Sequence, residues 1–387
     1  MTETLDYGSL TWPEIASLPR NTPLVIPLSY DFIFDSIAAT LDHPPRIGVL
    51  PAIPFGWEGS GITLPESILV TFVKNLLDSL REDGFQRVYA VTPPGIAMSL
   101  GAARIVVPGR HGTQKSSRMY CPPEDARQKV VLIPIGHTEQ HGLHLPMSTD
   151  TMIIETICRQ VSESAPDQAV SIPVMPYGVS THRSSFAGTL NAGGRAFEDF
   201  WLGIIDVLVQ RGFDRFYLLS GHGGNSSFLV NVVKYAGELH RRIFCATSWL
   251  YLSGPKGIEA LSQFRRSSIG GMGHAGELET ALILYIHPEL VRTDLIEDEM
   301  DFITTSSYYM DWVEGGALVA NPPWDDDTRT GAYGAGSLAR AENGEIWLKI
   351  AVEEKLDHVR EIHEQHNRRE GRRQAGFGLW GKVYPSK

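Results

Sequence analysis

The sequence predicts an α/β protein with three layers, α/β/α, and a largely parallel sheet, present as two related lobes. Short apolar runs alternate with longer segments in which apolar residues recur at helical spacing. A pattern found within the first half of the chain returns in the second half. Of the 387 residues, 42% are hydrophobic and 20% charged, an ordinary globular balance that needs no disulfide staples.

The second half of the chain shows strands and helices in alternation. Residues 149–164 carry Ile153, Ile157 and Val161 four apart, as one face of a helix requires. A second helix is expected to end at Gly212. Its apolar face comprises Phe197, Phe200, Trp201, Ile204, Ile205 and Leu208. The expected strands are 130–135, 170–175, 215–219 and 244–249, with further helices from Ser226 and over 345–363 before a solvated basic tail from Asn367.

The helical pattern of residues 197–208 has a counterpart earlier in the chain, over 69–80. Three other matches keep the same order in both halves. They are Pro27–Asp31 with Pro146–Asp150, Pro51–Gly56 with Pro173–Gly178, and Gly84–Tyr89 with Gly212–Tyr217. The offset grows along the chain, as loop insertions would produce. We therefore expect a duplication, with a degenerate lobe and linker over 1–127 and a complete domain over 128–387.

Composition narrows the class of partner. The 45 acidic and 34 basic side chains give a net charge of −11, which disfavours nucleic acid and anionic membrane surfaces. Cys121, Cys158 and Cys245 are too few and too scattered for a disulfide framework. No apolar run is long enough for a membrane helix, and the first residues lack the pattern of a signal peptide. We expect a cytoplasmic protein that acts on a small molecule.

The richest segment in ligand-type side chains is 136–150, directly after a predicted strand. It offers three imidazoles and two carboxylates, among them Glu139, His141 and Asp150. These are suitable ligands for a divalent cation, and ligand sites in open α/β sheets lie beyond the carboxyl ends of strands. The alternative is a polar surface loop, which the apolar flanks disfavour.

Two further clusters follow. Ser220–Asn225 places His222 in a glycine-rich loop after a strand; a phosphate-cradling loop is the rival interpretation, but the Lys of a P-loop is missing. The third cluster, His274 to Thr280, opens an apolar helix. There Glu277 alone would more commonly stabilise the helix N-terminus than bind a metal.

Together these residues resemble the creatininase (creatinine amidohydrolase) family. The motifs are Glu139-x-His141, Asp150, Gly221-His222-Gly-Gly-Asn225 and His274-Ala-Gly-Glu277, with Tyr177-Gly178 and Phe186-Ala-Gly-Thr189 as weaker matches. The resemblance covers roughly residues 128–365, more than half of the chain. It implies a metal-dependent amidohydrolase with two divalent ions, and a homo-oligomer that forms a closed ring.

The resemblance also implies a role for each site residue. Asp150 would bridge the ions, Glu139 and His222 would hold one, and His141 the other. Gly224 stands where creatininase has a glutamate that completes the second ion, so Glu277 is expected to substitute there and to act in catalysis. His274 would transfer a proton. Mixed carboxylate and imidazole ligands favour Zn²⁺, with Mn²⁺ or Fe²⁺ as alternatives.

Departures from the family pattern fall on the expected substrate pocket, to which we assign His144, His182 and Arg183. The family usually has Pro where Ala187 stands, and a histidine where Arg183 stands, with His182 displaced by one. This argues against creatinine itself as substrate. Arg183 would suit a carboxylate or phosphate, or is simply a surface residue.

The first lobe has lost the corresponding ligands. The positions that match Glu139, His141 and His222 are Arg20, Thr22 and Pro94, whereas Asp31 matches Asp150. One carboxylate cannot hold a catalytic dication, so we expect this lobe to be metal-free and to act as a packing partner.

The expected reaction is hydrolysis of a small cyclic amide or related C–N bond by activated water. Deformylation, cleavage of a small peptide bond and hydrolytic ring opening of a cyclic ketone would use the same groups. A metal-stabilised scaffold without activity and a sugar-phosphate isomerase are two further possibilities.

Overall fold

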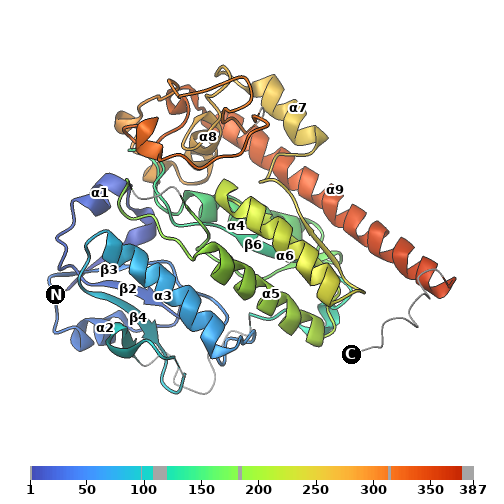
Figure 1. Cartoon of the computed structure of the whole chain (residues 1–387), viewed down its shortest axis with the longest axis horizontal. Coiled ribbons are helices and arrows are strands. Elements are labelled where there is room, and N and C mark those ends of the chain that lie inside the picture. The colour runs from blue at the N-terminus through green and yellow to red at the C-terminus, as the bar shows by residue number, and fades with distance from the viewer. Residues whose placement is uncertain (1, 97, 108–119, 182–184, 313–314, 377–387) are drawn as a thin grey trace.

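The computed structural model describes residues 2–96, 98–107, 120–181, 185–312 and 315–376, and contains two parallel sheets (Figure 1). The first has the order β1-β3-β2-β4-β5, and the second β7-β6-β8-β9. The strands are β1 (Glu3–Asp6), β2 (Leu24–Pro27), β3 (Arg46–Val49), β4 (Val88–Thr92), β5 (Arg104–Val106), β6 (Val130–Ile135), β7 (Ala169–Ser171), β8 (Arg215–Ser220) and β9 (Phe244–Thr247).

Helices cover both faces of the second sheet. The α-helices are α1 (Trp12–Ala16), α2 (Phe34–Thr40), α3 (Glu66–Glu82), α4 (Thr149–Ser164), α5 (Gly194–Gln210), α6 (Ser226–Leu239), α7 (Pro255–Phe264), α8 (Glu277–Ile286) and α9 (Ala341–Gln374). Successive residues of β6 alternate between two cores: Val130 and Leu132 pack with α4 and α9, whereas Val131 and Ile133 pack with α5 and α6. Burial on both faces explains the continuous apolar run of this strand. The predicted parallel α/β fold with helices on both sides is confirmed.

Several boundaries differ from the prediction. The strand expected over 170–175 is the shorter β7, and the helix expected over 345–363 is the longer α9. The basic tail from Asn367 therefore begins as helix and not as irregular chain. Ion pairs three or four residues apart, such as Arg368 with Glu364 and Arg373 with Glu370, stabilise this last part of α9.

The two sheets share one strand order over four strands. The neighbouring strands β3, β2, β4 and β5 of the first sheet have the same spatial order as β7, β6, β8 and β9 of the second, when each set is numbered along the chain. Helices α3 and α5, which carry the repeated pattern, pack against each other between the sheets (Figure 1). Phe72 and Phe200, which occupy matching positions in the two copies, stack with ring centroids 4.5 Å apart. One hydrophobic core therefore runs through both lobes.

Candidate metal centre

The candidate site lies at the carboxyl ends of β6 and β8. Strand β6 ends at Ile135 and leads into the loop that carries Glu139 and His141, and Asp150 lies in the first turn of α4. His222 follows β8, and His274 precedes α8. All of these side chains are buried. Folding thus brings together three segments that lie far apart in the sequence.

Three histidines are each fixed by a backbone carbonyl. His222 Nε2 lies 3.0 Å from the carbonyl of Val179, and His141 Nδ1 lies 3.1 Å from that of Glu139. His274 Nε2 lies 2.6 Å from the carbonyl of Gln140. When the ring is neutral and one nitrogen donates its proton to the carbonyl, the other nitrogen presents a lone pair to the interior of the cluster. Metal-binding histidines typically use this arrangement.

The two oxygens of Asp150 face different histidines. Oδ1 lies 3.1 Å from His141 Nε2, and Oδ2 lies 3.3 Å from His222 Nδ1. On the His222 side, Glu139 Oε1 lies 2.9 Å from the same Nδ1. On the His141 side, Glu279 Oε2 lies 3.9 Å from Nε2. The arrangement is that of one carboxylate shared by two adjacent ligand sets.

The carboxylates of this cluster raise the pKa values of His141 and His222. Burial alone would lower the pKa of His141, but Asp150 raises it to about 9. Burial would likewise lower the pKa of His222, but Glu139 and Asp150 raise it well above its usual value. Glu139 Oε1 and Asp150 Oδ2 are both buried, and both face the same nitrogen, His222 Nδ1. Divalent cations would replace the protons on the histidines and bind these buried carboxylate oxygens, so this donor set fits them.

Glu277 does not join this cluster, and the expectation for it needs correction. Its carboxylate accepts hydrogen bonds from the backbone amides of Arg266 and Ser267, at 2.7 to 3.1 Å. Glu279, two residues further along α8, faces His141 instead. Residues two apart on a helix point about 200° apart, so only one of the two carboxylates can face the site. The sequence signal was present, since both acids lie in the first turn.

Two motif residues, Asn225 and Gly224, lie against the backbone of Val179 beside His222. The side chain of Asn225 accepts a hydrogen bond from the Val179 amide at 2.9 Å, and so fixes the carbonyl that orients His222. A Cβ at Gly224 would lie 2.4 Å from His222 Nε2 and 2.5 Å from the Val179 oxygen. A side chain at this position would therefore displace His222 or the Val179 carbonyl.

His137 is a buried site residue to which the sequence analysis assigned no role. Its Nδ1 accepts a hydrogen bond from the Gly178 amide at 2.9 Å, so a neutral ring carries its proton on Nε2, 3.9 Å from Glu139 Oε2. Burial, and after it His222, lower the pKa of His137 to about 3. With Glu139 and His222 it forms a buried group whose ligand-type atoms lie within 4.8 Å of one another, so it could also hold a metal ion. The signal was its place two residues before Glu139.

Of the three residues expected in the substrate pocket, the structure describes only His144. His144 is buried, with Nε2 2.9 Å from Thr280 Oγ1, and does not line the cavity at the ligand cluster. His182 and Arg183 lie outside the described residues.

A cavity of about 640 Å³ opens onto the ligand cluster. Glu139, His222, His274 and Glu279 form part of its wall. His274 contacts the ring of Trp324 at a centroid distance of 4.7 Å. Burial, and after it His141, lower the pKa of His274 to about 3, so its imidazole is neutral.

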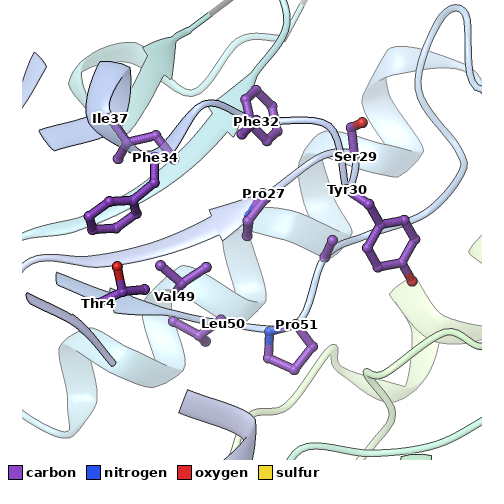
Figure 2. Close-up of a pocket in the computed structure, with 11 residues that line it drawn as sticks. Thr4, Pro27, Ser29, Tyr30, Phe32, Phe34, Ile37, Val49, Leu50 and Pro51 are labelled. Carbon is purple, nitrogen blue, oxygen red and sulfur yellow. The ribbon is translucent and has the colours of Figure 1, made fainter. Parts of the chain in front are cut away.

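A second cavity, of about 380 Å³, lies in the first lobe at the ends of β2 and β3. Figure 2 shows aromatic and aliphatic side chains around it, including Phe32, Phe34 and Val49. Its lining contains no carboxylate, imidazole or thiol among the described residues, and Asp31 is not part of it. Over the same described ranges, the three clusters of possible metal ligands all lie in the second lobe.

Comparisons with known proteins find similar sequences and structures. The family model described as creatinine amidohydrolase matches residues 120–359. Creatinine amidohydrolase of Pseudomonas putida is 28% identical over 252 residues, which are 60% of this chain and 89% of that protein. The mycofactocin precursor peptide peptidase of Mycobacterium ulcerans is 32% identical over 205 residues, 49% of this chain and 70% of that protein. A solved structure of a mutant creatininase superposes with a TM-score of 0.51 at 25% identity, covering 62% of this chain and 94% of that one.

Proposed function

This chain belongs to the creatininase family and is a hydrolase, and from that premise we propose that it cleaves a small amide C–N bond with two divalent metal ions. The observation that carries the proposal is the shared carboxylate of Asp150, whose two oxygens face two sets of ligand atoms. A scaffold protein has no physical need for such a buried charge cluster.

We assign Glu139, Asp150 and His222 to one ion, and His141, Asp150 and Glu279 to the other. The ligand atoms of the His141 set lie within 4.8 Å of one another, and in the other set His222 Nδ1 lies 2.9 Å from Glu139 Oε1 and 3.3 Å from Asp150 Oδ2. Such mixed ligands without thiolate suit Zn²⁺ first, with Mn²⁺ or Fe²⁺ as alternatives. When bound, the ions supply Lewis acidity and lower the pKa of water toward neutrality.

The chain's own residues would handle the proton. His274 Nε2 is engaged by the Gln140 carbonyl, so Nδ1 is the free nitrogen, 3.6 Å from Glu139 Oε1. In its neutral form, Nδ1 can accept the proton of the attacking water and return it to the leaving nitrogen. Trp324 packs on the ring and limits its rotation. His274 is therefore the general acid and base of this proposal.

An acyclic amide is the second candidate substrate, alongside a cyclic one. The relative at 32% identity is named as a peptide peptidase. The cavity of about 640 Å³ is also far larger than a molecule the size of creatinine needs. Deformylation of a formamide would use the same arrangement.

We propose that residues 1–127 form a metal-free lobe that braces the catalytic loops of 128–387. The carbonyls of Gly8 and Leu10 accept hydrogen bonds from the amides of Ser148 and Met147, at 3.0 and 2.8 Å. The Met147 carbonyl in turn accepts one from the Glu139 amide at 3.1 Å. The backbone of a ligand is therefore connected to the first lobe through two hydrogen bonds.

We propose further that the protein works in the cytoplasm as a homo-oligomer on small molecules, and not on nucleic acid or membranes. The net charge of −11 supports small molecules over nucleic acid and anionic membranes, the three free cysteines support the cytoplasm, and the homo-oligomer follows from the family resemblance alone. Within the described part of the chain, no helix has the length and apolar character needed to cross a membrane.

The test is metal analysis of purified protein together with assays on a lactam, a formamide, a dipeptide and a cyclic ketone. We expect hydrolysis of at least one amide, loss of turnover with a chelator while the circular dichroism spectrum is kept, and recovery with Zn²⁺ or Mn²⁺. Turnover that survives complete metal removal would overturn the proposal. Unfolding on chelation would indicate a structural ion instead.

A further inference from the structure

Two groups of aromatic side chains wall the cavity on either side of the ligand cluster. The first is the pair Trp249 and Trp312, with ring centroids 5.7 Å apart. Both lie directly over the loop that carries His222, because a Cβ on Gly223 would come within 3.2 Å of Trp312 and 3.4 Å of Trp249. This pair therefore adjoins one side of the candidate metal centre.

The second group is a stack of three rings beside His274. Phe302 and Tyr333 stack at 4.2 Å with an interplanar angle of 13°, and Tyr333 and Trp324 at 4.9 Å with 24°. Trp324 then contacts His274. All three rings line the same cavity as the indole pair. The proposed scissile bond would thus lie between two aromatic walls.

The mouth of the cavity is apolar as well. Ile303, Leu318 and Val319 line the cavity and are 70%, 61% and 93% exposed, and Trp249 is 44% exposed. Exposed apolar side chains gathered at one opening are typical of a ligand site and not of an ordinary surface.

Away from the ligand cluster, the described side chains around the cavity carry no positive charge. No Lys or Arg is among the described residues that line it. Apart from the proposed ligands, its acidic groups are Asp311, which pairs with Arg265, and Asp327, which accepts hydrogen bonds from the Tyr333 hydroxyl and the Ile303 amide. At the aromatic walls, the electron-rich ring faces and the carboxylate of Asp327 favour a neutral or cationic group over a negatively charged one.

We propose that the substrate is an amide that carries a flat aromatic or heteroaromatic group without negative charge, held by these walls while its C–N bond lies at the metal centre. This inference rests on the proposed function for the reaction, but it concerns recognition, which can be measured separately. Burial of one flat ring between aromatic walls stabilises a complex by both apolar area and ring contacts.

The test compares three matched probes on the metal-loaded protein. Hippuramide is neutral and carries a phenyl ring, hippurate has the same ring with a negative charge, and N-acetylglycinamide is neutral without the ring. Binding is followed by the change in tryptophan fluorescence immediately after mixing, and hydrolysis by release of ammonia. We expect hippuramide to bind at least about tenfold more tightly than either of the other two.

Two variants locate the effect. Trp249→Leu and Trp312→Leu should each weaken hippuramide binding several-fold without changing that of N-acetylglycinamide. Trp249 is partly exposed, so its variant is expected to fold even if loss of Trp312 disturbs the loop. The matched control is Tyr235→Leu, an aromatic residue on α6 that is 52% exposed and does not line the cavity; it should leave all three affinities unchanged.

Hippurate binding as tightly as hippuramide, or equal binding of N-acetylglycinamide, would overturn the inference on substrate class. Tight and selective binding of hippuramide without any hydrolysis of amides would instead contradict the proposed function and leave the recognition intact. Hydrolysis of amides without preference for the ring would support the proposed function and contradict the inference on substrate class.

Discussion

Replacement of Glu279 by glutamine should remove one of two metal ions and leave the other in place. Glu279 belongs only to the ligand set on the His141 side, whereas the set on the His222 side contains Glu139 and Asp150. Glutamine keeps the size of the side chain and removes its charge. The variant should therefore hold one tightly bound ion per chain where the unmodified protein holds two.

The size of the effect follows from the charge that is lost. Changes to groups that merely support metal ligands cost roughly 10 to 100-fold in affinity, about 3 kcal/mol at the upper end. Coulomb attraction between a dication and a carboxylate about 4 Å away is about 8 kcal/mol at an effective dielectric constant of about 20. The binding free energy lost when a direct ligand is replaced should lie between these two values. We expect the second affinity to fall by more than about 100-fold.

The assay is elemental analysis after gel filtration, with calorimetric titration of Zn²⁺ into chelator-treated protein. The matched control is Glu277→Gln, in the same turn of α8, whose carboxylate binds the amides of Arg266 and Ser267. This variant should lose stability but keep both ions. Two tightly bound ions in Glu279→Gln, or one in Glu277→Gln, would show that the second ligand set is wrongly assigned.

Two further predictions concern stability. Phe72→Ala should lower the free energy of unfolding by about 3 to 5 kcal/mol, because it removes a fully buried ring stacked on Phe200; urea denaturation should show both lobes unfolding together, and a loss below about 1 kcal/mol would contradict a shared core. His144 has its pKa lowered from 6.5 to about 4, mainly by burial, so the unfolded chain takes up its proton first and stability is lost as pH falls from about 6.5 to about 4. Between pH 7 and 5, His144→Gln should therefore lose about 2 kcal/mol less than the unmodified protein, and equal losses would refute this.

The strands of the sheet and the two helices with the repeated spacing could be predicted from the sequence because both depend on local periodicity. The spacing of residues 197–208, repeated over 69–80, marks two helices that occur in the structure as α5 and α3. Periodicity does not set where an element stops when side-chain pairs continue it, as they do beyond Asn367 in α9. The contact between Phe72 and Phe200 also needs the tertiary structure, since each residue alone only indicates a buried face.

For the candidate site too, only some of the residues could be predicted from the sequence. Motif spacing brought forward Glu139, His141, Asp150 and His222, which the structure places within one buried cluster. The choice between Glu277 and Glu279 could not be made from spacing, because it depends on how α8 is rotated about its axis. Likewise, the aromatic walls come from segments separated in sequence, and no periodic pattern links them.

Counting metal ions per chain in Asp150→Asn tests the central claim most directly. If one carboxylate serves both ligand sets, its loss should deplete both ions together, whereas a change on one side alone depletes only one. We expect two ions in the unmodified protein and none retained through gel filtration in this variant, with the circular dichroism spectrum preserved. A variant that keeps two ions, or loses only one, would contradict a shared carboxylate at this site.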